Sequence, residues 1–489
     1  MRQGWAVGAC RRGYSYVEGG SADGRRHGTM STTTPVQSVS TVDLRELSAD
    51  VVRKAMKGGA TAAEVVLRDG SEFSTTVRLG EVETLKESGS RSMGVRVFFG
   101  KRSASTWSSD FSPQGIDNMV RGALDLAKIT SEDPFSGIPE PEQLGQITTN
   151  LDLYYEDVYS LSTADRIDYA KRAERAAMEA DPRIQNSDGA SFDAANGVKV
   201  LANSNGFIGD YSRSYCSVSA VPIAQQEGSA MQRDYWFSVA RTLSMLESPE
   251  DVGREAARRA LRRLGAKKVK TARVPIVFDP LVAGSLLGHI FEAVNGDSVY
   301  RGASYLAGKL NEKIAGANVT IVDDGTMVGG FGSSPFDAEG VPTRRTVVIE
   351  KGILNSYLLN TYTAKKLKLQ TTGNAARGLA GTPGIGAGNF FMEPGTRTPQ
   401  QIFADVKDGF YVTEFLGSGV NLVTGDFSRG ASGVWIQNGE LTFPVEEVTV
   451  AGNLRDMLHS VVEIGNDLEF RGSVACPTMR IDGMTVGGE

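Results

Sequence analysis

The stretch 286–304, LLGHIFEAVNGDSVYRGAS, tells most about how this chain folds. A helix is predicted over residues 281–295, and the Gly296-Asp297 dipeptide that follows predicts its end. Apolar residues recur every four positions along it, so they share one face and are expected to pack into a core. This apolar stripe consists of Val282, Leu286, Ile290 and Val294.

The opposite face of the same helix is polar, and it carries the only chemistry near this stretch. His289 and Glu292 lie one turn apart. A helical zinc site usually presents two imidazoles four residues apart, with a glutamate to activate water. The other histidines, His27 and His459, are far away in sequence. The favoured interpretation is therefore a hydrogen-bonded polar pair, and His289, Glu292 and Asp297 remain the alternative catalytic set.

Composition narrows the classes of function. The 489 residues suffice for two or three domains, and a net charge of −6 without a sustained basic run argues against a nucleic-acid partner. The basic stretch 258–270 is interpreted as a solvated helix face that runs into a linker. Cys10, Cys216 and Cys476 form no CxxC pair, and no apolar run approaches the ~20 residues of a membrane span, so a cytoplasmic protein is expected.

The pattern along the chain predicts an α+β protein with two folded domains. Residues 1–38 are expected to be a disordered N-terminal extension, and Met30 is a plausible alternative start. Residues 39–265 predict a mixed α/β domain in which helix and then sheet occur twice, which suggests an internal duplication. Residues 266–489 are rich in glycine and short strands, and predict a barrel-like domain of antiparallel strands.

Two local expectations follow from dipeptides and apolar runs. Asp69-Gly70 lies between two strand-like segments and predicts a tight turn. The run Asn389, Phe390, Phe391 and Met392 is extended and bounded by Gly388 and Pro394, so it is a candidate peptide groove that would pair with a substrate by β-augmentation. A buried core strand is the favoured alternative for that run.

An ordered set of motifs in the second half resembles the TldD/PmbA family of peptidases. The matching segments run in the family's order across nearly all of that half, whereas the first half matches more loosely, at GVRVF (94–98). The principal ones are GDSVYRGAS (296–304), GVPTR (340–344), TTGNAAR (371–377), GDFSRG (425–430) and PTMRIDGMTVG (477–487).

The resemblance also implies which type of subunit this chain is. TldD-type members carry an HExxxH helix before the Gly-Asp dipeptide and a cysteine ligand near the C-terminus, and PmbA or TldE-type members lack them. In that register the two histidines fall on Leu287 and Glu292 and the glutamate falls on Gly288, while Cys476 lies later than the ligand position. The C-terminal domain would therefore carry a degenerate peptidase helix, with no zinc in this chain.

The leading hypothesis is a PmbA/TldE-type subunit of a metalloprotease that cleaves peptides or unfolded proteins. The resemblance implies a heterodimer in which a TldD-type partner supplies zinc, although a homodimer stays open. Two alternatives also stay open: a self-sufficient hydrolase with an unconventional site, and a peptide-binding modulator without enzymatic activity.

Overall fold

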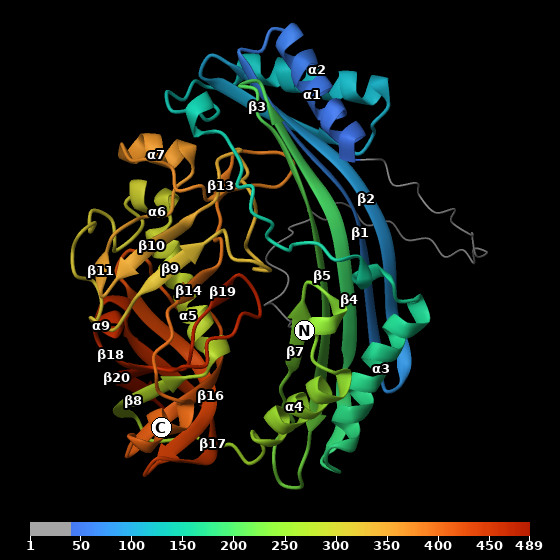
Figure 1. The fold of residues 1–489 in the computed structure, drawn as a ribbon. Helices are drawn as coiled ribbons and strands as arrows, with labels where there is room; N and C mark the ends of the chain where they lie inside the picture. Colours follow the sequence, from blue (N-terminus) through green and yellow to red (C-terminus); the bar gives the residue numbers. More distant parts are fainter. Residues whose placement is uncertain (1–40) are drawn as a thin grey trace.

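The computed structural model describes residues 41–489; the expected extension 1–38, with Cys10 and His27, lies outside this range. The N-terminal part is one long, strongly curved sheet (Figure 1). Its strand order is β3-β2-β1-β4-β5-β6, with β7 also paired to β5. The strands are β1 (Ala62–Arg78), β2 (Glu81–Phe99), β3 (Arg102–Ser108), β4 (Ile184–Asn203), β5 (Ile208–Ala224), β6 (Gln232–Arg233) and β7 (Trp236–Ala240).

The order of elements repeats in the two halves of this sheet, as the sequence suggested. The first half runs α1–β1–β2–β3–α2 and the second runs α3–β4–β5–β6–β7–α4, and the antiparallel pair β1–β4 joins them at the centre. The four helices are α1 (Thr41–Lys57), α2 (Pro113–Ile129), α3 (Thr163–Glu179) and α4 (Pro249–Leu261).

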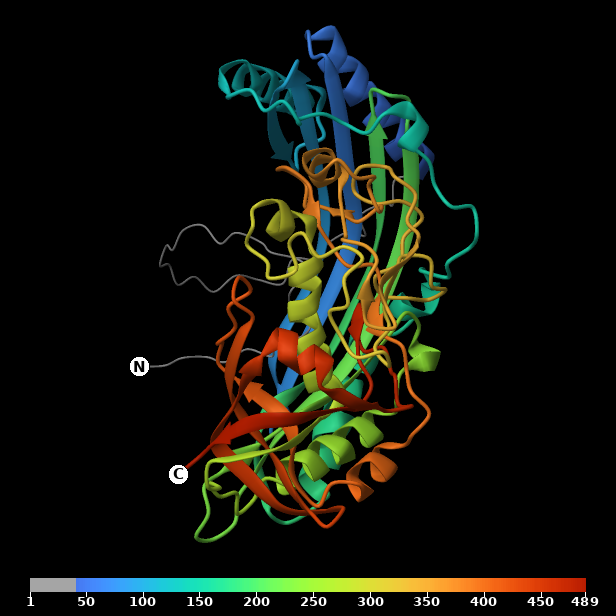
Figure 2. The same ribbon diagram turned by 90° about the vertical axis from the view of Figure 1, so that its left-hand side faces the viewer.

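Alternation along the strands separates a helix-covered face from a face that meets the C-terminal domain. On β1, Val65 and Leu67 pack with α1 and α2, whereas Val66 packs against Phe336 of the C-terminal domain. The sheet is thus buried on both faces over part of its length, and Figure 2 shows the C-terminal domain in front of it.

The predicted turn at Asp69-Gly70 is wrong, because β1 runs through these residues without a break. Asp69 pairs with Arg91 on β2 and with Val198 on β4, so the hydrogen-bonded ladder continues on both sides. Gly70 lies opposite Gly197, and a Cβ on Gly70 would come within 2.4 Å of the Asn196 carbonyl oxygen. Glycine is needed here for close strand approach and not for a turn.

The C-terminal domain is sheet-rich and contains a closed barrel. The ring of strands is β17-β16-β15-β8-β20, and β20 pairs back with β17. One pair, β8–β15, is parallel, which departs from the antiparallel expectation; the other pairs in the ring are antiparallel. The ring consists of β8 (Ala272–Phe278), β15 (Asp408–Leu416), β16 (Asp426–Gln437), β17 (Glu440–Asn453) and β20 (Met479–Gly487). The strand β18 (Val461–Ile464) pairs with the first part of β20, and β17 pairs with its last part.

A second sheet and several short helices complete this domain. Its strand order is β11-β10-β9-β14-β19, and a separate pair is formed by β12 (Ala375–Ala376) and β13 (Gly384–Ile385). The five strands are β9 (Ile321–Asp324), β10 (Arg345–Glu350), β11 (Ile353–Leu354), β14 (Phe390–Met392) and β19 (Val474–Ala475). The helices are α5 (Pro280–Val294), α6 (Gly296–Tyr300), α7 (Thr361–Leu367), α8 (Pro399–Ala404) and α9 (Leu454–His459).

Helix α5 lies between the barrel and this second sheet. Phe291 of α5 makes an edge contact with Phe390 of β14, with ring centroids 5.5 Å apart. His289 of the same helix makes an edge contact with Phe427 of β16, at 6.4 Å. Among the described helices none is long and apolar enough to cross a membrane.

Candidate functional site on helix α5

Side-chain caps fix both ends of helix α5. Asp279 is the N-cap, and its carboxylate accepts a hydrogen bond from the Leu281 backbone N–H at 3.1 Å. Asn295 ends α5 and caps α6, because its side-chain oxygen accepts from the Asp297 N–H at 2.9 Å. The Asn-Gly-Asp exit therefore serves to start the next helix.

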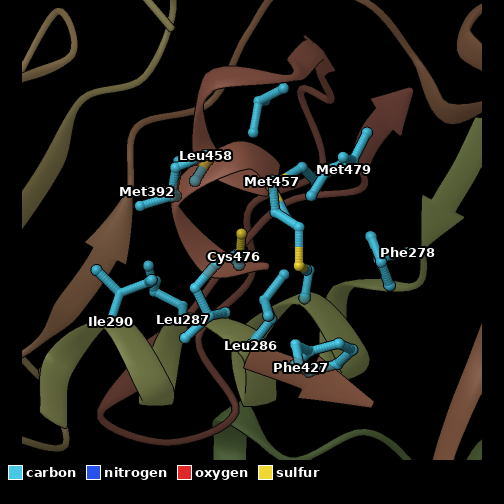
Figure 3. Close-up of a cluster of buried hydrophobic side chains, with 14 of the residues drawn as sticks. Phe278, Leu286, Leu287, Ile290, Met392, Phe427, Met457, Leu458, Cys476 and Met479 are labelled. Carbon is cyan, nitrogen blue, oxygen red and sulfur yellow. The ribbon is translucent and has the colours of Figure 1, made fainter. Parts of the chain in front are cut away.

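The apolar stripe is buried as predicted. Val282, Leu286, Ile290 and Val294 are each at most 5% exposed. Figure 3 shows Leu286, Leu287 and Ile290 pointing toward side chains of α9 and toward Cys476. Together with their neighbours these side chains leave a cavity of only about 10 Å³. It is lined by Ala283, Leu286, Leu287, Ile290, Met392, Leu454, Met457, Leu458, Cys476, Met479 and Ile481.

The positions that correspond to the family's zinc motif do not fit a zinc ion. Leu287 is 2% exposed and belongs to this apolar cluster, so the first histidine position faces the core. Glu292 is exposed, and a Cβ built on Gly288 would have no atom within 4 Å, so these two positions face away from it. The donor set therefore offers neither an imidazole nor a thiolate at these positions.

Cys476 also lacks the properties of a metal ligand. Its side chain is fully buried in the apolar cluster. Burial, aided by the charge of Asp467, raises the pKa of the Cys476 thiol well above its usual range. A thiol must ionise to bind zinc, so a neutral thiol in an apolar pocket is a packing group.

The alternative set His289, Glu292 and Asp297 is placed along the same helix and the next one. His289 is half-buried and Glu292 is exposed. Asp297 forms an ion pair with Arg301, one turn later on α6, at 2.9 Å. Across residues 41–489 no group of three or more His, Cys, Asp or Glu side chains gathers where it could hold a metal ion.

The candidate groove at 389–392 is an internal strand. β14 pairs with β9 over Phe390–Met392 and with β19 at Phe390 and Phe391, so both edges of its centre are occupied. Asn389, Phe390 and Met392 are buried, and the half-buried Phe391 packs against Phe470 at 5.4 Å. The edge-strand interpretation is therefore corrected in favour of the core strand, because neither backbone side is available to a peptide.

Buried charges that the sequence analysis missed lie between the two domains. Glu64 of β1 is fully buried and pairs with Arg96 of β2 at 2.5 Å and with Arg377, which comes from the C-terminal domain. Burial alone would raise the pKa of Glu64, but Arg377 and Arg96 outweigh it and hold the pKa below its usual value. A signal was present in the sequence, since Glu64 interrupts the apolar strand Ala-Ala-Glu-Val-Val-Leu.

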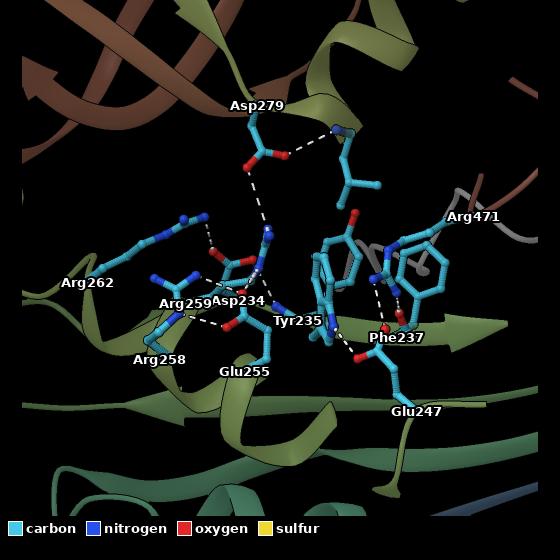
Figure 4. A network of polar contacts seen from close by, with 12 residues as sticks. Asp234, Tyr235, Phe237, Glu247, Glu255, Arg258, Arg259, Arg262, Asp279 and Arg471 are labelled. Carbon is cyan, nitrogen blue, oxygen red and sulfur yellow. Dashed lines mark hydrogen bonds and ion pairs between the residues drawn. The ribbon is translucent and has the colours of Figure 1, made fainter. Parts of the chain in front are cut away.

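A second polar network ties the N-terminal domain to the start of helix α5 (Figure 4). Arg259 of α4 pairs with Glu255 at 2.8 Å and reaches the helix cap Asp279 at 3.8 Å. Arg471 of the C-terminal domain pairs with Glu247 at 2.8 Å and donates to the Phe237 carbonyl oxygen at 2.6 Å. The N-terminal end of helix α5 is thus held in place by contacts between the two domains.

Comparison with known families matches almost the whole described chain. Three models of the PmbA/TldA metallopeptidase match in succession: domain 1 over residues 63–127, the central domain over 156–264 and the C-terminal domain over 271–488. The chain therefore belongs to this metallopeptidase family, which is the TldD/PmbA family that the motifs resemble.

Individual relatives agree with this assignment. The chain is 38% identical to the Metalloprotease PmbA of Escherichia coli O157:H7 over 91% of this chain and 97% of that protein. It is 35% identical to the Metalloprotease PmbA homolog of Haemophilus influenzae, over 91% and 96% of the two chains.

Solved structures share the whole fold. A protein of Bacteroides thetaiotaomicron, described as a candidate modulator of DNA gyrase, is 30% identical with a TM-score of 0.86, over 92% of this chain and 100% of that one. TldE from Thermococcus kodakarensis has a TM-score of 0.82 at 21% identity, over 90% of this chain and 100% of that one, which shows the fold alone.

Proposed function

We propose that this chain is the zinc-free subunit of a two-chain metallopeptidase. A TldD-type partner would supply the zinc ion, its ligands and the glutamate that activates water. This chain would complete the enclosure around the substrate and help to hold a peptide in extended form.

The burial of Leu287 carries this proposal. Its side chain occupies the position of the family's first histidine and packs into a cluster of apolar side chains without a nitrogen or oxygen donor. A metal ion in that cluster would lose its hydration without gaining ligands, which is strongly unfavourable. Helix α5 is retained because its apolar stripe packs into the core. The zinc ligands and the catalytic glutamate would come from the partner chain.

The test is to purify the chain alone and together with a TldD-type partner, and to measure zinc content and cleavage of an unfolded peptide substrate. Zinc and activity are expected in the pair and not in the lone chain. Stoichiometric zinc with activity in the lone chain would contradict the proposal. His289→Ala in the active pair serves as a further control, because a site built on His289, Glu292 and Asp297 would lose its activity.

A second candidate is a peptide-binding modulator that works without a peptidase partner. It is favoured by one observation, the description of the Bacteroides thetaiotaomicron relative as a candidate modulator of DNA gyrase. The two functions differ in their genomic context, since the first requires a chain with an HExxxH helix in the same genome. A genome without such a chain would favour the modulator.

A further inference from the structure

The face of the N-terminal sheet that meets the C-terminal domain carries basic side chains in a cross-strand row. Arg68 on β1 lies opposite Lys199 on β4, and Lys199 lies opposite Tyr211 on β5. Arg213 follows Tyr211 on the same face of β5. The ring of Tyr211 lies 5.3 Å from that of Phe336 in the C-terminal domain, which shows that this row faces the other domain.

Carboxylates do not neutralise the two most informative members of this row. Among residues 41–489, no ion pair within 4 Å includes Lys199 or Arg213. One terminal nitrogen of Arg213 donates to the Ser333 carbonyl oxygen at 2.7 Å, and the Nε of Arg213 is buried without a hydrogen-bond partner. The Nζ of Lys199 lies 5.8 Å from the centre of the Tyr211 ring.

This arrangement costs stability unless something compensates for it. Like charges directly opposite each other on neighbouring strands repel, as Arg68 and Lys199 do. Burial and then the positive charges of Arg68 and Arg213 lower the pKa of Lys199. Burial alone would raise the pKa of Tyr211, but Arg213, Lys199 and Arg68 bring it to about 8. The row is therefore a region of concentrated positive potential.

A purely structural role explains only part of the row. The hydrogen bond from Arg213 to Ser333 helps to hold the two domains together, as does the bond from Arg68 to the Arg377 carbonyl oxygen at 3.0 Å. A neutral donor in place of Arg213 would make the bond to Ser333 without repulsion. A structural role also leaves unexplained why Lys199 is half-buried near the positive charges of Arg68 and Arg213.

We propose that Lys199 and Arg213, with Arg68 and the Tyr211 hydroxyl beside them, bind a carboxylate of an extended peptide. A guanidinium offers a planar fork and an ammonium offers a point charge, and both suit a carboxylate in a partly desolvated site. This subsite deepens the proposed function, because it rests on the chain holding a peptide on this face. The carboxylate is that of an acidic side chain or that of the peptide's C-terminus.

The chain's own N-terminus is a poor occupant by charge. Residues 1–40 contain five arginines (positions 2, 11, 12, 25 and 26) against Glu18 and Asp23, which is a net charge of 5 − 2 = +3. A segment of the same sign as the row gains nothing from it. An acidic peptide supplied from outside has the complementary charge.

The test compares three labelled octapeptides that share one uncharged sequence, by fluorescence anisotropy on the chain with and without its partner. One carries a single glutamate and an amidated C-terminus, the second has glutamine in place of the glutamate, and the third is the glutamine peptide with a free C-terminus. A carboxylate that binds the row should improve affinity about tenfold over the neutral peptide. Comparing the first peptide with the second tests a side-chain carboxylate, and comparing the third with the second tests a C-terminal one.

Variants show whether the preference comes from this row. Lys199→Met and Arg213→Gln should remove the preference for the carboxylate peptide over the neutral one, and Lys407→Met, at an exposed site on the C-terminal domain, should keep it. The variants are expected to fold, because each removes one of several repelling charges. A preference that survives Lys199→Met, a wild type without preference, or no peptide binding in either preparation would overturn the inference.

A second readout responds to charge and not to packing. Bound carboxylate should raise the pKa of Tyr211 from about 8 toward its usual value, which reduces tyrosinate absorbance at pH 8. The Tyr211→Phe variant gives the background to subtract. An unchanged difference spectrum at saturating acidic peptide would contradict the inference. Because neither readout uses zinc or cleavage, a failure of the two-chain proposal would show separately from a failure here.

Discussion

The core around helix α5 excludes charged side chains, whereas the seam between the two domains, at Glu64, Arg96 and Arg377, buries them. At α5, where the family's zinc motif would lie, Leu287 and its neighbours are apolar and closely packed. At the seam, Glu64, Arg96 and Arg377 are buried ions from three segments. The first region contributes apolar packing, and the second gathers buried charges.

Buried charge indicates where a function can reside in this chain. A buried ion is retained only if it is paired or used, since desolvation costs several kcal/mol for each charge. The seam retains a paired cluster and, a few residues further along β1, the basic row at Arg68 and Lys199. The apolar cluster around Leu287 contains no charged side chain, so we do not expect catalytic chemistry within it.

The largest expected effect comes from breaking the pair at the seam. Glu64→Gln leaves the guanidinium groups of Arg96 and Arg377 buried without their acid, and should lower the free energy of unfolding by about 3–5 kcal/mol. Urea denaturation measures it. Asp50→Asn removes one partner of the exposed Asp50–Arg53 pair and should cost less than about 1 kcal/mol. Equal losses in the two variants would mean that the seam is no more stabilising than a surface pair.

The next effect probes the apolar core at the family's first histidine position. Leu287→His places an imidazole among apolar side chains and should cost about 3 kcal/mol without recruiting zinc. Leu287→Met conserves volume and should cost less than about 1.5 kcal/mol. Thermal unfolding and metal analysis give both answers. A Leu287→His protein of normal stability that binds zinc would erase the contrast between the two regions.

Asp323 is a buried acid that forms no ion pair within residues 41–489, so its contribution to stability depends on pH. Burial raises the pKa of Asp323 to about 7, although Asn374 donates to it at 2.7 Å. The folded state therefore holds this proton more tightly than the unfolded chain does, where the pKa is about 3.9. Its contribution to stability is complete below about pH 4 and is lost as the pH rises through about 7.

The expected result concerns the difference between Asp323→Asn and wild type. Relative to wild type, the variant should gain on the order of 3 kcal/mol between pH 4.5 and 7.5, because only wild type loses the stability of the protonated acid. Asp110, whose pKa is lowered by the backbone hydrogen bond from Ser112, gives a control variant Asp110→Asn with a flat difference over this range. A flat difference for Asp323→Asn would show that its carboxyl is ionised in the fold.

The smallest effect lies on the open side of helix α5. Gly288 is in the helix interior, and an added Cβ would meet no atom within 4 Å. Gly288→Ala should therefore stabilise the protein by about 0.5–1 kcal/mol, since alanine favours the helix. Gly296→Ala is the matched control and should destabilise it, because its Cβ would lie 2.5 Å from Leu359. Calorimetry of both variants tests whether only the inward positions of this segment are constrained.

Much of this fold could be predicted from the spacing of apolar residues and from turn residues. The stripe of α5 follows from four-residue spacing, and all four members are buried. The repeated order of helix and then sheet could also be predicted, because each half forms its helices and strands from its own residues. The turn at Asp69-Gly70 failed, because strands on both sides of β1 keep it extended, and a dipeptide preference says nothing about neighbouring strands.

The candidate site could be predicted only in part. The vacant motif positions were visible in the sequence, and their opposite orientations, Leu287 inward and Gly288 outward, were not. For the strand 389–392 the sequence favoured a core position but left an edge open, because pairing on its two sides comes from residues far along the chain. Glu64 and Arg377 are 313 residues apart, so no local pattern could join them.

The central claim is that this chain does not supply the zinc chemistry of its family. Its most direct test is the metal content of the purified lone chain after exposure to zinc and removal of the excess, measured by mass spectrometry beside the complex with a TldD-type partner. We expect zinc in the complex, one ion per pair, and only trace amounts in the lone chain. One tightly held zinc per lone chain would contradict it.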